Sequence, residues 1–128
     1  MKLVMQRANG DCGLAALASL LELSYEDVYI AAAKVDKKTR GRNGICFQSL
    51  ISIGKKLGVS FLLKRHHEDE DEGLLAVTWQ QPHEHPFPAH LVALSYGVIA
   101  DPADGVILPV DEYLTKYRAA AGSCLELR

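Results

Sequence analysis

The chain changes its hydrophobic periodicity once, after Gly58, and this change limits the folds open to it. Before Gly58, apolar residues recur near the helical period, as in "LAALASLL" and "FQSLISIGKK". After Gly58, apolar residues form short runs rich in valine and leucine, separated by glycine, proline and acidic residues, as in strands and turns. Helices followed by strands predict an α+β fold with a mostly antiparallel sheet, and they argue against βαβ repeats.

We expect three helices in the first part. The first runs from Cys12 to Leu23, with Asp11 as its N-cap. The second begins at Ser24, which has capping-box spacing to Asp27, and continues through "VYIAAAK". The basic segment "VDKKTRGRNG" is typical of an exposed loop, and the third helix spans "CFQSLISIGKKLG" with Gly58 placed to end it.

The second part predicts a meandering sheet. Its strands are "VSFLLK", "LLAVTW", "HLVALSY", "VIAD" and "VILPV", with turns at Gly97 and "PADG". We expect "DEYLTKYRAAAG" to form a last helix and "SCLELR" a last strand. No repeat or linker is visible, so the 128 residues predict one domain spanning 1–128.

Composition excludes several classes of protein. The formal net charge is −2 and the pI is near 6.2, which gives no electrostatic basis for binding nucleic acid or an anionic membrane. No apolar run approaches the roughly 20 residues that a membrane span needs. The start, "MKLVMQ", lacks the apolar region of a secretory signal, so we expect a cytoplasmic protein without a membrane span.

The three cysteines, Cys12, Cys46 and Cys124, are widely spaced and contain no CxxC pair. An odd number at such spacing argues against a disulfide framework or a zinc knuckle, so we expect free thiols. Cys46 and Cys124 are predicted to pack in the core, although the position of Cys46 near a helix start leaves its reactivity open.

Cys12 differs because candidate partners for thiol catalysis exist elsewhere in the chain. It lies in the first turn of a predicted helix, where the helix dipole favours a thiolate. A hairpin at Gly97 would place His90, at the start of one strand, beside Asp101, at the end of the next. Asp101 could then orient the imidazole, with Asp104 as its rival in the same turn, and the Gln6 amide could face an oxyanion near Cys12.

Four segments carry a resemblance to a known family. "Q-x5-DCG" from Gln6 to Gly13, "NGICFQSLISIGKKLGVSF", "HLVALSYGVIADPADG" and "VDEYLTKY" together resemble, in order, the C39 peptidases. These are papain-like domains that cut double-glycine leaders from bacteriocins. The papain signature C-G-[SA]-C-[WY] is absent, so the resemblance is to the C39 branch.

This resemblance implies a papain-like fold, with an N-terminal helical half packed on a mostly antiparallel sheet. It implies a cysteine peptidase in which Cys12 is the nucleophile, His90 the base, Asp101 the orienting residue and Gln6 the oxyanion donor. The implied partners are a peptide or protein substrate, cleaved after small Gly-type residues, and a separate exporter or precursor peptide. We expect no cofactor and no metal.

Other readings remain open. The sequence stops at Arg128 with no exporter attached, so we expect a stand-alone domain whose substrate could be another peptide or amide. The same fold could serve as a catalytically silent peptide-binding module, or as a thiol acyltransferase or deconjugating enzyme.

The remaining histidines lie in polar segments. His66 and His67 stand in "HHEDEDE", which we interpret as a solvated loop and not as a metal site. His83 and His85 belong to a proline-rich loop that could flank the cleft and touch substrate. Trp79 could line the same cleft, although the core is the expected place for it.

Overall fold

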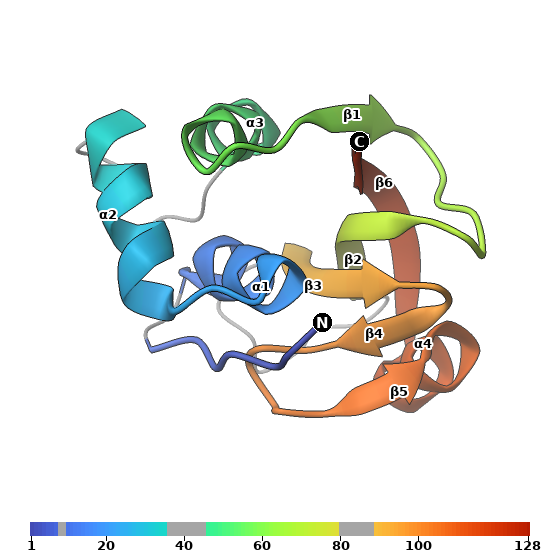
Figure 1. Ribbon diagram of the computed structural model, residues 1–128. Coiled ribbons are helices and arrows are strands. Elements are labelled where there is room, and N and C mark those ends of the chain that lie inside the picture. Colours follow the sequence, from blue (N-terminus) through green and yellow to red (C-terminus); the bar gives the residue numbers. More distant parts are fainter. Residues whose placement is uncertain (8–9, 36–45, 80–88) are drawn as a thin grey trace.

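The structure is a computed structural model that describes residues 1–7, 10–35, 46–79 and 89–128 (Figure 1). The elements in chain order are α1 (Cys12–Leu21), α2 (Tyr25–Val35), α3 (Phe47–Lys56), β1 (Phe61–Lys64), β2 (Glu72–Trp79), β3 (Ala89–Ser95), β4 (Val98–Ala100), β5 (Ile107–Pro109), α4 (Val110–Tyr117) and β6 (Ala119–Leu127). Helices come first and the sheet follows, as the change of periodicity predicts.

The helix boundaries follow local signals. α1 ends two residues earlier than expected, because Glu22 adopts a left-handed conformation with φ 56°. Ser24 caps α2, since its Oγ accepts a hydrogen bond from the Asp27 N–H at 3.1 Å. Gly58, with φ +89°, closes α3 as expected by donating its N–H to the Lys55 carbonyl at 3.1 Å.

The six strands form one antiparallel sheet in the order β1-β6-β2-β3-β4-β5. The α+β class with an antiparallel sheet is therefore confirmed. The expected simple meander is wrong, because β6 inserts between β1 and β2. The helix predicted over residues 111–122 is also wrong beyond Tyr117: Arg118 is left-handed with φ 49°, and the alanines after it pair with β2.

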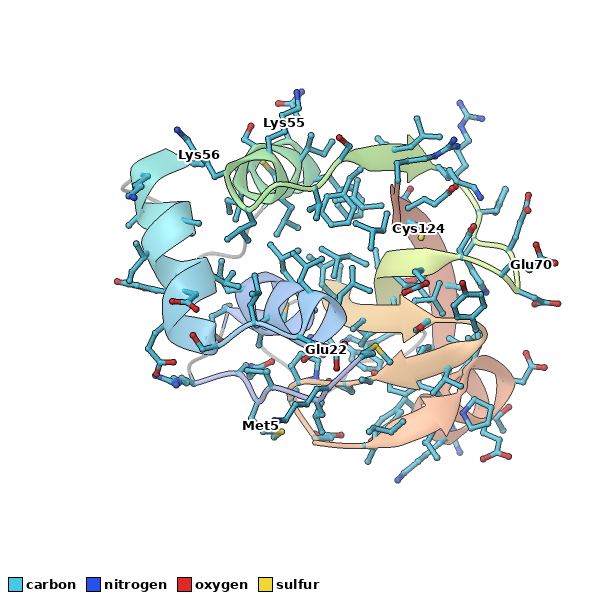
Figure 2. All side chains as sticks on the ribbon, in the orientation of Figure 1. Met5, Glu22, Lys55, Lys56, Glu70 and Cys124 are labelled. Carbon is cyan, nitrogen blue, oxygen red and sulfur yellow. The ribbon has the colours of Figure 1, made fainter. Side chains whose placement is uncertain are left out.

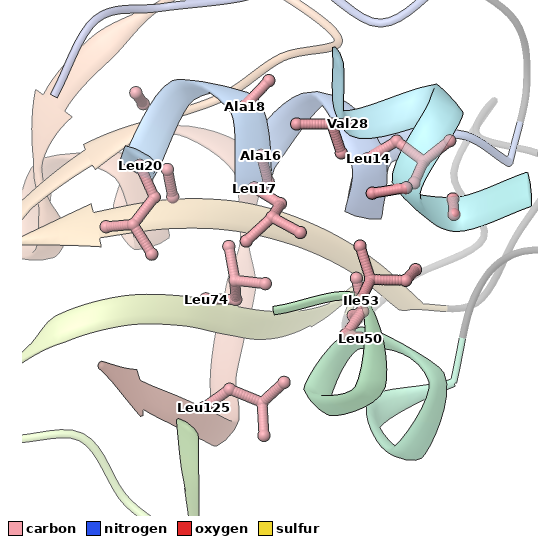
Figure 3. Packing of buried hydrophobic residues seen from close by; sticks show 14 residues of the cluster. Leu14, Ala16, Leu17, Ala18, Leu20, Val28, Leu50, Ile53, Leu74 and Leu125 are labelled. Atoms are coloured by element: carbon pink, nitrogen blue, oxygen red, sulfur yellow. The ribbon is translucent and has the colours of Figure 1, made fainter. Parts of the chain in front are cut away.

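The sheet separates two hydrophobic cores. Neighbouring strand residues alternate between the cores because successive side chains point to opposite faces. On one face, Leu74 and Leu125 pack against α1 and the helices beside it (Figure 3). On the other face, Leu75 and Val92 pack with Tyr113 of α4. The first three helices thus cover one side of the sheet and α4 covers the other (Figure 1).

The polar surface surrounds these cores. The labelled side chains of Lys55, Lys56 and Glu70 extend outward from the periphery, whereas Cys124 lies within the sheet region (Figure 2). The acidic loop before β2 is anchored and not wholly solvated, since buried Asp71 accepts a hydrogen bond from Lys64 Nζ at 2.8 Å. Within the described ranges, no helix combines the length and the apolar character that a membrane span requires.

Candidate active site

Cys12 is the first residue of α1, as predicted, and its side chain is half-buried. The helix start abuts β3: a Cβ on Gly13 would lie 3.3 Å from Leu91 Cδ1, one residue after His90. Cys12 lines a pocket of about 350 Å³ together with Cys46, Phe47, Ala76, Ala89, His90 and Leu91. The thiol therefore faces an open cleft with a helix N-terminus behind it.

His90 approaches from the strand side of this cleft. It is the second residue of β3, and strand alternation places it with Val92 and Leu94 on the α4 face of the sheet. Its ring stacks on Trp79, with centroids 6.1 Å apart and planes inclined by 23°. The imidazole is buried and interacts with the Cys12 thiol. Trp79 is thus half-buried against the candidate base. It lies neither fully in the core nor fully exposed in the cleft, which were the two places expected for it.

Asp101 completes a chain of contacts that begins at Cys12. The β3–β4 hairpin at Gly97 brings the two residues together as the sequence predicts, and His90 Nε2 lies 2.7 Å from Asp101 Oδ1. The Ala103 N–H donates to the same oxygen at 2.8 Å. Asp104 is exposed, so Asp101 is the carboxylate that contacts the imidazole.

These contacts change the ionisation of both buried groups. Burial alone lowers the pKa of His90, but the hydrogen bonds to Asp101 and Cys12 outweigh it and raise the pKa to about 9. Burial raises the pKa of Asp101, yet the bond from His90 and its other donors bring it below the usual value. The geometry therefore favours an imidazolium beside a carboxylate, which is the charge state that stabilises a neighbouring thiolate.

The segment before Cys12 is fastened by a second buried carboxylate. Asp11 precedes α1, but its side chain makes no capping bond, contrary to the predicted role. Its Oδ2 instead accepts hydrogen bonds from the Arg7 N–H at 2.9 Å and the Tyr25 hydroxyl at 2.7 Å. The Arg7 guanidinium lies 4.3 Å from the Tyr25 ring centroid and pairs with Glu26. Asp11 thus ties the start of α1 to α2.

Gln6 lies on this fastened segment and is half-buried. Its backbone N–H donates to the Pro102 carbonyl at 2.9 Å, directly after Asp101 in the chain. The structure thus brings the Gln6 backbone beside the turn that carries Asp101, and Cys12 beside the strand that carries His90.

The other two cysteines occupy contrasting places. Cys124 is fully buried, as predicted, and burial raises its pKa to about 11. The prediction that Cys46 packs in the core is wrong: it is exposed as the N-cap residue of α3. Its Sγ lies 3.4 Å from Ser49 Oγ, and this bond, with backbone N–H donors of the helix start, lowers the thiol pKa. A second ionisable thiol therefore lines the Cys12 pocket.

No cluster of three or more histidine, cysteine or acidic side chains suited to a metal ion occurs in the described part of the chain. His66 is exposed, and His67 is partly exposed beside it. His83 and His85, offered as substrate contacts, lie outside the described residues, as does the basic segment 35–44 except for Val35.

Sequence reasoning missed one member of the buried cluster. The Tyr113 hydroxyl donates to Asp101 Oδ2 at 2.6 Å, and the whole residue is inaccessible to solvent. Nothing in "VDEYLTKY" marks this tyrosine as different from Tyr117, because only the packing of α4 shows which one faces Asp101. The helical pattern of α4 covers only 8 residues, which is too short to separate the two tyrosines from sequence alone.

A family model identifies the chain. The model for "Peptidase C39 family" matches residues 1–117. The chain belongs to the C39 peptidase family. A Streptococcus structure, "the peptidase domain of ComA, a bi-functional ABC transporter involved in quorum sensing pathway", shares the fold with a TM-score of 0.59 and 18% sequence identity. The match covers 98% of this chain and 96% of that one.

No curated protein matches this C39 peptidase. Family and fold agree with the resemblance found in the sequence, so the chain is a cysteine peptidase of the papain-like fold that acts on peptides.

We predict that the His90 imidazole of this C39 peptidase titrates near pH 9 and that Asp101→Asn moves the midpoint down toward 6.5. Because the pKa of His90 is higher in the folded state than in the unfolded state, its protonation contributes to the free energy of unfolding. This contribution is complete below pH 6.5 and is lost as the pH rises through about 9. NMR titration of the His90 ring resonances in the wild type and in Asp101→Asn measures both midpoints. A His90 midpoint unmoved by Asp101→Asn would contradict the assigned cause.

Proposed function

We propose that the peptidase cleaves its substrate through a thioester at Cys12, with His90 as acid and base, Asp101 as the orienting residue and Gln6 as the oxyanion donor. The observation that carries this proposal is the buried His90–Asp101 contact of 2.7 Å. The same imidazole interacts with the Cys12 thiol at the N-terminus of α1. The arrangement supplies a nucleophile, a base and a group that fixes the base.

The orientation of the His90 ring supports the direction of proton transfer. His90 uses Nε2 toward Asp101, which leaves Nδ1 as the ring nitrogen for the thiol and the leaving group. The Cys12 thiolate adds to the scissile carbonyl carbon, and Nδ1–H then protonates the departing amine as the C–N bond breaks. Water, deprotonated by Nδ1, next attacks the thioester carbon and releases the carboxylic acid and the thiol.

Gln6 is the proposed donor to the tetrahedral intermediate. Its backbone is fixed by the bond to Pro102, and Arg7 beside it is bound by Asp11. A side-chain amide on such a held segment can present an N–H to the oxyanion without reorganisation.

For the substrate, we propose a peptide with small residues of the glycine type before the scissile bond. The support is the family resemblance, in which cleavage follows glycine pairs. The apolar pocket beside Cys12, lined by Phe47 and Leu91 among others, is where the peptide would lie. A precursor peptide with such a leader, or an exporter that carries it, is the corresponding partner.

We predict that Cys12→Ala abolishes peptide hydrolysis, lowering kcat by about three orders of magnitude or more, because no other group replaces the nucleophile. Hydrolysis of a fluorogenic peptide measures this. Cys46→Ser is the matched control, because it removes the second pocket thiol and should leave the nucleophile intact.

Alkylation adds an independent readout. Cys46 is exposed with a lowered thiol pKa, so iodoacetamide labelling rates alone do not separate the two thiols. The effect of His90 on the labelling rate separates them, because His90→Ala should slow modification of Cys12 about tenfold and leave the rate at Cys46 unchanged. Equal labelling of Cys12 with and without His90 would reject the nucleophile assignment.

We predict that Gln6→Ala lowers kcat by about 10²–10³ with little change in KM, because the donor acts on the transition state. Alkylation of Cys12 forms no oxyanion, so its rate should stay at the wild-type value and serves as the internal control. If hydrolysis and alkylation fall together, Gln6 supports the local fold and is not the oxyanion donor.

We predict a preference for peptides with glycine or alanine in the two positions before the cleaved bond. Replacing the last of these residues by leucine should lower kcat/KM by about tenfold or more. Mass spectrometry of cleavage products from a matched peptide pair measures the ratio and the cleavage site. Equal cleavage of both peptides would contradict the small-residue proposal.

A further inference from the structure

The Asp101 carboxylate is held from three directions. Oδ1 faces His90 Nε2 at 2.7 Å and the Ala103 N–H at 2.8 Å. Oδ2 accepts the Tyr113 hydroxyl at 2.6 Å. Asp101 is 2% exposed, His90 1% and Tyr113 0%, so both side-chain donors contact the carboxylate away from solvent. Each bond involves a charged acceptor, the class of hydrogen bond that is strongest in proteins.

Tyr113 reaches this carboxylate from a separate element. It lies in α4, whose start is fixed to the hairpin by the bond from the Val110 N–H to the Gly97 carbonyl at 3.0 Å. The Tyr113 ring packs in the core on that face of the sheet and lies 4.6 Å, centroid to centroid, from Tyr117. A side chain so enclosed holds one rotamer, and its hydroxyl is therefore a fixed donor.

The bond sets the rotation of the carboxylate. A carboxylate held only through Oδ1 can turn about its Cβ–Cγ bond, and Oδ1 then leaves the line to the imidazole. The Tyr113 bond to Oδ2 opposes this rotation. Burial raises the pKa of Tyr113, and the negative charge of Asp101 raises it further. The phenol therefore stays a neutral hydrogen-bond donor at neutral and mildly alkaline pH.

We propose that Tyr113 is a positioning residue of the peptidase, acting on His90 through the orientation of Asp101. This inference rests on the proposed Cys12, His90 and Asp101 mechanism. Because Tyr113 is inaccessible and bonds the Asp101 oxygen that His90 does not contact, we expect it to contact no substrate. Its loss therefore affects kcat and leaves substrate binding alone.

The first test is Tyr113→Phe, which keeps the packed ring and removes the donor. We expect kcat to fall about tenfold with KM unchanged, as for the loss of a hydrogen bond to a buried charge. Tyr117→Phe is the matched control: it removes a hydroxyl from the neighbouring ring, one that bonds Asp104 instead, and kcat should stay within about twofold. Circular dichroism of each variant checks that it is folded before the two rates are compared.

A double-mutant cycle separates positioning from general destabilisation. If Tyr113 acts through Asp101, then Tyr113→Phe should have no further effect on kcat in the Asp101→Asn background. The same tenfold loss in both backgrounds would overturn the proposal, as would a Tyr113→Phe enzyme with wild-type kcat. An enzyme insensitive to Cys12→Ala or Asp101→Asn would instead reject the underlying mechanism, which is a different result.

Discussion

The buried Asp101 carboxylate requires hydrogen-bond donors, and several elements of the structure meet at this group to supply them. An ionised side chain out of contact with water is stable only where donors surround it. Here the donors come from β3, from the turn after β4 and from α4, so three segments must adopt their final positions together. The same contacts that offset the cost of burial include the bond to the imidazole, so in the proposed mechanism stability and chemistry depend on one set of bonds.

The site joins two layers that pack independently. Cys12 belongs to the helical layer, whose leucines cover one face of the sheet. His90 and Tyr113 belong to the α4 layer on the opposite face. Cys12 is the first residue of α1 and His90 is the second residue of β3. The thiol and the imidazole meet because these two element starts lie at the same margin of the sheet, where both residues line one pocket. This accounts for a cleft at that margin, lined by residues from both halves of the chain.

Much of this arrangement could be predicted from local signals. The Ser24 cap, the Gly58 stop and the Gly97 hairpin each act within a few residues, and the hairpin alone brings His90 to Asp101. The insertion of β6 could not be predicted in this way, because strand pairing across the chain leaves no local trace. Alanines after Tyr117 favoured a helix by propensity, and pairing with β2 overrode it.

Errors at single side chains have a similar origin. Asp11 has the sequence position of a cap, yet Tyr25 and the Arg7 backbone compete for its carboxylate. Cys46 was assigned to the core by residue type, whereas its place at the very start of α3 exposes it. Tyr113 and Tyr117 look equivalent in the sequence until the helix is docked. For Asp11 and Tyr113 the outcome depends on a neighbour distant in sequence, whereas for Cys46 it follows from the position in the helix.

The bond between the Gln6 backbone and Pro102 has a consequence for biosynthesis. A ribosome makes the Cys12 segment before the residues around it in the fold, because His90, Pro102 and Tyr113 all follow it in the chain. A nascent chain that ends before α4 can therefore carry Cys12 but cannot enclose Asp101. In the proposed mechanism the nucleophile is therefore synthesised before the groups that would activate it, and a chain that stops before α4 has the thiol without the enclosed Asp101.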